Sequence, residues 1–444
     1  MSRRARLLLP VELLTIIGSL VRHPDLPAFA LASKCLNTIA TPHLYARVEL
    51  VDFLSAKACF RTLSLSPAVV YSGRDLPKLV RVVIVRQSAF GQPVAHEWLG
   101  EQLLRSMDRM VNLEVLRCGD YALVSLLQIL GVLALKSFPK LQIVELAVDS
   151  PLDNAADDSS SDLQPVLPSL RTLKLFLSER LPPRSMVFLQ SIVGACAVQL
   201  EWLVLSTPGT HPMPAQILAN PDVFPALTSL EVEWDVLHSL PIAALHRIRA
   251  LSVRSFFDPY AHPVLPNGAF PALEELTCSC LHVGAFFGDE VDTPRPIHTI
   301  TLDRASYERN GGSFLEVLPE WKELRGAFAD FARSTVPVKN LRFCVARLNI
   351  RAMAQGLSGL KGLESLLIVL QSHPTRVSAY PLFYDTRLYL TLRLRRTNCK
   401  LSVGRSSPTC PACTRCYSRT HLTSTTTRAR ASGSRAMSRC SGRS

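Results

Sequence analysis

One short pattern of apolar residues recurs along most of the chain. An aliphatic residue is followed by apolar residues three and five positions later, written L-x-x-L-x-L, as in LPSLRTLKLFL at 167–177. Side chains alternate between the two faces of a strand, so positions +3 and +5 share a face and the pattern predicts a strand that buries it. The eleven copies begin at Leu79, Leu113, Leu141, Leu170, Leu200, Leu227, Ile248, Leu273, Ile297, Leu341 and Leu363.

The spacing of these copies, about 28 residues on average, is typical of leucine-rich repeats, in which each unit adds one strand and one return segment to a shared core. We therefore expect an α/β solenoid. The residue eight positions after each start, usually Asn or Cys in that family, varies here, so the horseshoe should be irregular. The alternative is an ordinary α/β protein, because an apolar strand between helices gives the same pattern.

A second pattern, with helical spacing, occupies the N-terminus. Leu13, Ile16, Ile17 and Leu20 recur at helical intervals after Pro10, a residue favoured in the first turn of a helix. The following segment, DLPAFALASKCLNTIATPHLYARVEL, continues with a second amphipathic face. The N-terminal stretch therefore predicts two or three short helices.

This N-terminal stretch resembles an F-box. The matching residues keep the order of that family: Leu9-Pro10, Glu12-Leu13-Leu14, Ile17, Leu20, Asp25-Leu26, Ser33-Lys34 and Pro42-His43-Leu44-Tyr45. The resemblance implies a helical module that docks by helix-in-groove contacts onto the adaptor subunit of an SCF-type ubiquitin ligase, and through it reaches the cullin. The residues implied as adaptor contacts are Leu9, Pro10, Leu13, Leu14 and Ile17. Alternatively, these helices only cap the solenoid, as repeat proteins require.

The patterns together predict four parts. These are an all-helical F-box-like module at 7–50, a linking helix at 51–75, an irregular leucine-rich-repeat solenoid at 76–371 and a disordered tail at 386–444. The tail contains thirteen Lys and Arg and no Asp or Glu, so it carries the whole formal charge of +13 and the body is neutral. Such a basic, Ser- and Thr-rich end attracts anions only weakly, and nucleic acid is not expected as a partner. The abrupt loss of the repeats after Leu370 favours a frameshifted or misjoined end.

The cysteines indicate no disulfide framework and no metal centre. Seven of the twelve lie scattered through the body, which is typical of buried thiols in a reducing compartment, so we expect the cytoplasm or the nucleus. The tail segment CPACTRC is one crowded cluster rather than two separated ligand pairs, so neither a zinc site nor another cofactor is expected. No apolar stretch is long enough to span a bilayer, and Pro10 and Glu12 disfavour a secretory signal.

No catalytic motif occurs in the sequence. G-x-S-x-G, H-E-x-x-H, the phosphate-binding loop and G-x-G-x-x-G are all missing, so we do not expect an enzyme. The sequence instead predicts a substrate-recognition subunit of an SCF-type ligase that captures a target protein on its strand face. The alternative is a protein-binding scaffold with no ligase role. The residues expected to contact the target, from strand positions that face away from the core, are Phe176, Trp202, Glu231, Glu233, Trp234, Arg254, Arg304 and Arg347.

Overall fold

A computed structural model describes most of the body of the chain. The described residues are 9–64, 75–85, 101–118, 138–148, 167–177, 183–206, 220–237, 245–254, 268–287, 295–303, 305–309, 313–317, 319–345, 348–371, 387–395 and 398–405, with a few isolated positions between them.

The N-terminal segment is helical. It contains α1 (Val11–Leu20), η1 (His23–Asp25), α2 (Leu26–Leu31) and α3 (Lys34–Ala46), and α4 (Phe53–Leu63) follows after the first strand. Helices α3 and α4 begin at side-chain caps, because Ser33 Oγ accepts from the Leu36 amide and Asp52 Oδ1 accepts from the Ser55 amide. Buried Leu26, Ala30 and Ala40 form a small core between α2 and α3.

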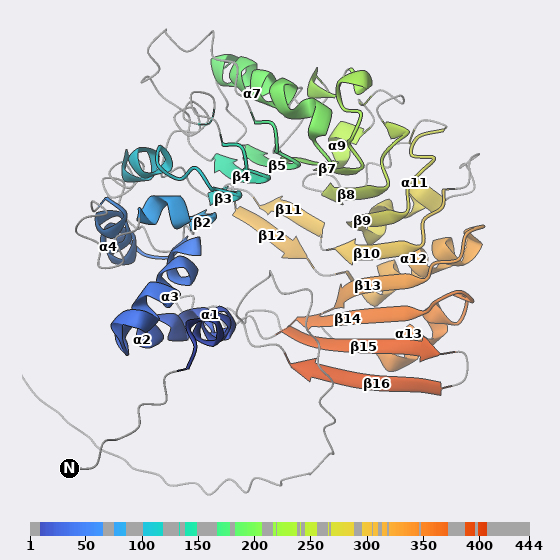
Figure 1. The fold of residues 1–444 in the computed structure, drawn as a ribbon. Helices are drawn as coiled ribbons and strands as arrows, with labels where there is room; N and C mark the ends of the chain where they lie inside the picture. Colours follow the sequence, from blue (N-terminus) through green and yellow to red (C-terminus); the bar gives the residue numbers. More distant parts are fainter. Residues whose placement is uncertain are drawn as a thin grey trace, which may run out of the picture.

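One sheet of fourteen strands runs through the described body (Figure 1). Its order follows the sequence from β1 to β10 and continues with β13 to β16. The strands are β1 (Arg47–Leu50), β2 (Val82–Val85), β3 (Val115–Cys118), β4 (Ile143–Val148), β5 (Thr172–Leu177), β6 (Trp202–Ser206), β7 (Ser229–Glu233), β8 (Ala250–Arg254), β9 (Glu275–Ser279), β10 (Thr299–Asp303), β13 (Asn340–Val345), β14 (Ser365–Gln371), β15 (Arg387–Arg395) and β16 (Asn398–Arg405). Strands β1 to β10, β13 and β14 are parallel, and β15 and β16 add antiparallel pairs. A separate antiparallel pair, β11 (Ala305–Arg309) and β12 (Ser313–Val317), follows β10.

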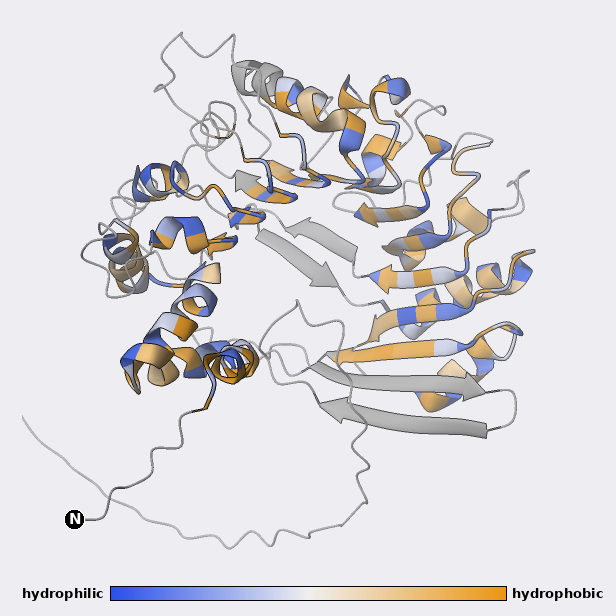
Figure 2. Cartoon of the chain, viewed as in Figure 1, coloured by the Kyte–Doolittle hydropathy of each residue, from blue (hydrophilic) through white to orange (hydrophobic). Residues whose placement is uncertain are grey.

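Helices lie along one side of this sheet, which Figure 1 shows for α7, α11, α12 and α13. Their bounds, with those of the other short helical elements, are η2 (Leu76–Leu79), α7 (Pro183–Cys196), η5 (Ala197–Gln199), η6 (Pro221–Val223), α9 (Trp234–Leu237), η7 (Cys280–His282), α11 (Gly284–Phe287), α12 (Trp321–Arg333) and α13 (Ile350–Leu357). Figure 2 shows hydrophobic and hydrophilic residues alternating along several of the strands. The apolar residues of these strands are buried in the core. One continuous core of buried residues extends from Val48 to Ile368.

The apolar pattern marks this core closely. Leu170, Leu173 and Leu175, the three apolar positions of one copy, are all fully buried, and each of the eleven copies coincides with a strand. Two copies were predicted in the wrong frame. The buried positions around β2 begin at Val80 rather than Leu79, and those around β13 begin at Val338 rather than Leu341. At both places the neighbouring residues are also apolar, so the pattern can be placed at more than one starting residue. Only the burial of the side chains in the structure decides which start is right.

The predicted fold, a helical module followed by a leucine-rich-repeat solenoid and a disordered tail, is wrong. The structure is an α/β fold built on one largely parallel sheet with helices. Strands buried beneath helices in a parallel sheet give the same apolar pattern, so the pattern could not separate the two architectures. β1 lies at the end of the segment predicted as all-helical, and β15 and β16 lie inside the segment predicted as disordered.

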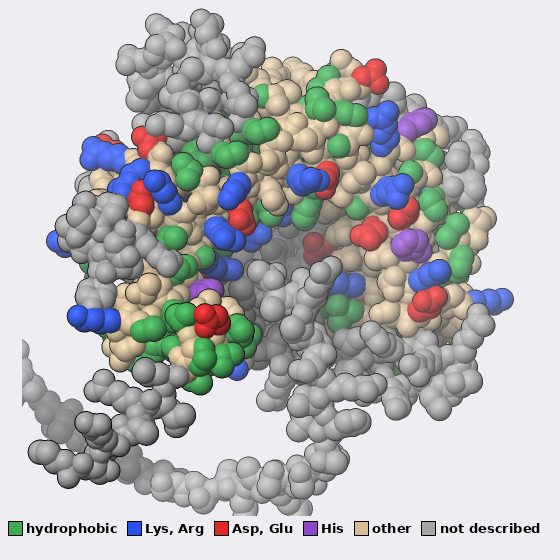
Figure 3. Space-filling view, in the orientation of Figure 1, with side chains coloured by type: hydrophobic (Ala, Val, Ile, Leu, Met, Phe, Trp, Pro, Cys, Tyr) green, Lys and Arg blue, Asp and Glu red, His purple; other side chains and the backbone are tan. Residues whose placement is uncertain are grey.

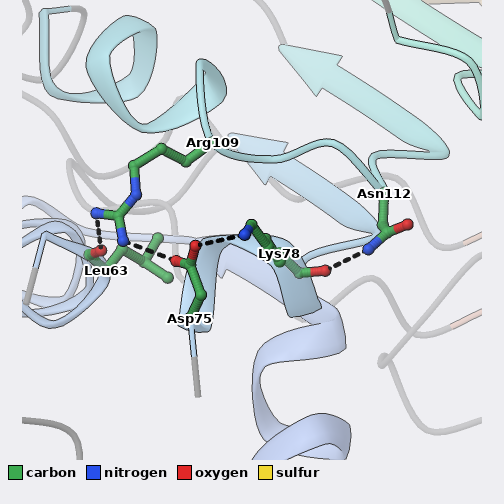
Figure 4. A network of polar contacts seen from close by, with 5 residues as sticks. All are labelled: Leu63, Asp75, Lys78, Arg109 and Asn112. Atoms are coloured by element: carbon green, nitrogen blue, oxygen red, sulfur yellow. Dashed lines mark hydrogen bonds and ion pairs between the residues drawn. The ribbon is translucent and has the colours of Figure 1, made fainter. Parts of the chain in front are cut away.

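A polar network joins the N-terminal helices to the first strands (Figure 4). Arg109 donates to the carbonyl of Leu63, the last residue of α4, at 3.3 Å and to Asp75 Oδ1 at 2.7 Å. Lys78 pairs with the same carboxylate at 3.3 Å, and Asn112 Nδ2 donates to the Lys78 carbonyl at 2.7 Å. Through Arg109, which lies 46 residues after Leu63 and 34 after Asp75, the end of α4 is joined to the segments that precede β2 and β3.

None of the described helices combines the length and the apolar character needed to cross a bilayer.

Candidate interaction surfaces

Helix α1 is an unusual surface among the described residues, because its large apolar side chains face solvent. Figure 3 shows hydrophobic side chains gathered over this helix. Their exposed fractions range from 40% at Ile17 to 77% at Leu20. The exposed members of this surface, which we call the α1 surface, are Leu9, Val11, Leu13, Ile16, Ile17 and Leu20. A helix that is apolar nearly all round is normally buried, so the α1 surface is expected to be covered by a partner.

The small residue Gly18 holds α1 against α3. It is the buried residue of this helix, and a Cβ built there would lie 2.8 Å from Ile39 Cγ2 on α3. The backbone of α1 therefore approaches α3 closely at this one point. The opposite side of the helix remains exposed because one line of contact cannot cover apolar residues placed all around it.

The structure exposes most of the residues predicted to contact the adaptor. Leu9, Pro10, Leu13 and Ile17 are exposed, and Leu14 is half-buried. The prediction from sequence missed Leu20, which is the most exposed residue of the α1 surface. It also missed Val11 and Ile16, although the signal was available: a helix with apolar residues on every side can bury only one side against a single neighbour.

A second surface lies on the strand face of β5 to β8. Lys174 Nζ lies 4.0 Å from the centroid of the Trp202 ring, and the Arg254 guanidinium carbon lies 5.2 Å from the centroid of the Phe176 ring. Arg254 also pairs with Glu231 at 2.5 Å. We call these five residues the aromatic–cation patch. Parallel pairing brings them together, because Lys174 is in register with Val204 and Val204 with Glu231, while Thr172 is in register with Trp202.

Two predicted target contacts prove to be buried. Glu233 and Trp234 are each only 2% exposed. Strand β7 ends at Glu233, whose carboxylate accepts a hydrogen bond from Ser206 Oγ at 3.2 Å, and α9 begins at Trp234. The Trp234 ring stacks on His282 with centroids 4.0 Å apart. Strand alternation ends at Trp234, where α9 begins, whereas Glu233 still belongs to β7 and is buried although alternation turns it away from the core. The predicted exposure of both residues is wrong.

The remaining predicted contacts divide into two groups. Phe176, Trp202, Glu231 and Arg254 lie together in the aromatic–cation patch. Arg304 and Arg347 lie outside the described residues. Lys174 was not predicted, although it occupies the same strand face two residues before Phe176.

The titratable groups of the described region give no reactive centre. Burial raises the pKa of the Cys118, Cys196 and Cys280 thiols to about 12, so these groups remain protonated and unreactive near neutral pH. Burial lowers the pKa of Arg295 to about 10, and this side chain donates to the Ala269 and Phe286 carbonyls, which is a structural role. Within the described ranges no group of three or more His, Cys, Asp or Glu side chains could hold a metal ion.

No protein-family model and no curated protein sequence matches this chain.

Proposed function

We propose that this protein is the substrate-recognition subunit of an SCF-type ubiquitin ligase. The α1 surface docks onto the adaptor subunit, which carries the cullin, and the strand face captures a target protein. The chain performs no bond chemistry in this proposal. It acts by proximity, since a target lysine held near a ubiquitin-loaded enzyme has a high effective concentration.

The observation that supports this proposal most strongly is the exposure of the α1 surface. Fully burying a Leu or Ile side chain contributes about 1.5–3 kcal/mol, so covering residues that are about half exposed contributes ~1 kcal/mol each. The six residues of the α1 surface therefore offer a large gain to a partner with an apolar groove. The resemblance of this stretch to an F-box supports the ligase adaptor as that partner.

A cap alone does not explain the α1 surface. A cap buries apolar side chains against the end of the sheet, and in this chain α3 and α4 contact β1 and η2 in that way. Helix α1 packs on α3 instead and leaves Leu13, Ile16 and Ile17 exposed. Capping therefore accounts for α3 and α4 but not for α1.

We place this function in the cytoplasm or the nucleus. Cys118, Cys196, Cys278 and Cys280 are thiols rather than disulfides, and each is buried or half-buried. Thiols in these positions are in keeping with a reducing compartment.

Affinity purification from cells tests the proposal. The full chain is compared with a Leu13→Glu/Ile17→Glu double variant, in which glutamate preserves helix propensity but opposes burial. Ile350→Glu is the matched control, because Ile350 is 67% exposed on α13, far from α1 in the sequence. The adaptor and cullin should co-purify with the parent and the control but not with the double variant. Their absence from all three samples, with folded protein, would leave a scaffold as the better account.

A further inference from the structure

The aromatic–cation patch presents positive charge outward even though its region contains acids. In the pair of Arg254 and Glu231 the side chains are 41% and 12% exposed, and in the neighbouring pair of Arg117 and Glu145 they are 36% and 29% exposed. In both pairs the cation is the more exposed member. In these pairs a ligand that approaches the face therefore meets a guanidinium group before the carboxylate.

Lys174 is the most available of these cations. Its ammonium lies over the Trp202 ring, and within the described part of the chain it makes no ion pair with a carboxylate. A cation over an aromatic face gains less than one paired with a carboxylate, so it can accept an anionic ligand without first breaking a salt bridge. Trp202 itself is 39% exposed, which leaves apolar ring surface uncovered beside this ammonium.

Arg254 and Phe176 form a second pair of a cation and an aromatic ring, near the carboxyl ends of β8 and β5. The guanidinium lies against the Phe176 ring and uses one side for Glu231. A guanidinium has five N–H donors, so donors remain for a second carboxylate. The patch therefore offers two cations, each beside an aromatic ring.

The acids on the same face select between possible ligands. Glu145 lies in register between Arg117 and Lys174, and Glu231 lies beside Arg254. A nucleic acid, which carries a phosphate at every nucleotide, would meet these carboxylates along its whole length. A peptide can place carboxylates on the cations and backbone N–H groups near the glutamates. Charge complementarity therefore favours a peptide.

We propose that the strand face between β3 and β8 binds acidic peptide segments in which an apolar or aromatic residue stands next to carboxylates. The carboxylates bind Lys174 and Arg254, and the apolar residue packs on Trp202. This proposal deepens the proposed function, on which it rests, by naming the class of segment that a target protein would present.

A titration of the purified full chain tests this proposal. The probe is a fluorescein-labelled heptapeptide with two glutamates on each side of one phenylalanine, and binding is followed by fluorescence anisotropy. Lys174→Glu and Trp202→Ala should each weaken binding at least tenfold, and Lys174→Gln should weaken it less than Lys174→Glu. Arg342→Glu, which alters an exposed cation on β13, should change the dissociation constant by less than twofold. Unchanged melting temperatures show that the variants fold.

Three results would overturn the proposal. They are equal binding of a peptide with lysines in place of the glutamates, unchanged binding by both Lys174 variants, or tighter binding of an oligouridylate of equal charge. The adaptor is not present in this titration. A negative result therefore removes the peptide proposal alone, whereas failure of the adaptor to co-purify removes the ligase role and leaves this binding face standing.

Discussion

The contact between Arg109 and α4 allows a quantitative test of how firmly the N-terminal helices are joined to the sheet. Arg109→Ala removes a hydrogen bond to the Leu63 carbonyl and a 2.7 Å ion pair with Asp75. Hydrogen bonds to charged groups contribute about 1.5–3 kcal/mol when buried. The Arg109 side chain is 37% exposed and Asp75 is 21% exposed, so solvent screening reduces this contribution to about 1–2 kcal/mol.

Hydrogen–deuterium exchange measures this loss locally. The carbonyl that loses its partner ends α4, so amides of residues 53–63 should exchange about 5- to 30-fold faster in Arg109→Ala, the factor that corresponds to 1–2 kcal/mol. Amides of β13 should be unaffected. The control is Arg105→Ala, which removes an exposed pair with Glu101, 72% and 56% exposed, from the same region. Equal effects of the two variants would refute the reasoning that burial makes the Arg109 contacts valuable.

Three further predictions concern packing and the thiols. Gly18→Val forces side-chain atoms into Ile39, so α1 should detach and limited proteolysis should cleave it at least tenfold faster, whereas resistance equal to the parent's would contradict the close approach. Phe343→Ala should lower the free energy of unfolding, measured by urea denaturation, by about 3–5 kcal/mol because Phe343 is fully buried. Ile350→Ala should lower it by less than about 0.5 kcal/mol, and equal losses would contradict the burial of Phe343 in the core. Iodoacetamide at pH 8.5 should modify exposed Cys35 but not Cys196, whose pKa is raised to about 12 by burial. Because unfolding lets that thiol ionise above its ordinary pKa of 9.0, its contribution to stability should fall as the pH rises from about 9 to about 12, and early modification of Cys196 would contradict its burial.

The sequence predicted the strands better than their assembly. The apolar residues of the pattern, such as Leu173 and Leu175, are buried because alternate strand positions face the helices. The pattern says nothing about how the strands are assembled, since any sheet covered by helices needs it. β15 was missed although Leu388, Leu390, Leu392 and Leu394 alternate with other residues, a pattern typical of a strand, because the basic composition of the tail was taken to indicate disorder.

The candidate surfaces were predictable where a local rule decides exposure. The exposure of Leu13 and Ile17 on α1 was predicted from the F-box resemblance, because helical spacing alone would bury them. Strand alternation was sufficient to place Phe176 and Trp202 on the outer face. Trp234 was misplaced because β7 gives way to α9 at that residue. The pairing of Lys174 with Trp202 depends on contacts between strands that lie about 30 residues apart, which periodicity within one segment cannot supply.

A calorimetric titration of the purified full chain with the purified adaptor subunit tests the central claim most directly. The full chain is preferable to a version ending before residue 386, because β15 covers the edge of β14. We expect saturable binding with one adaptor per chain, lost in Leu13→Glu/Ile17→Glu and retained in Ile350→Glu. Absence of binding by the folded parent, or equal binding by all three proteins, would contradict the assignment of the α1 surface as the adaptor-docking site.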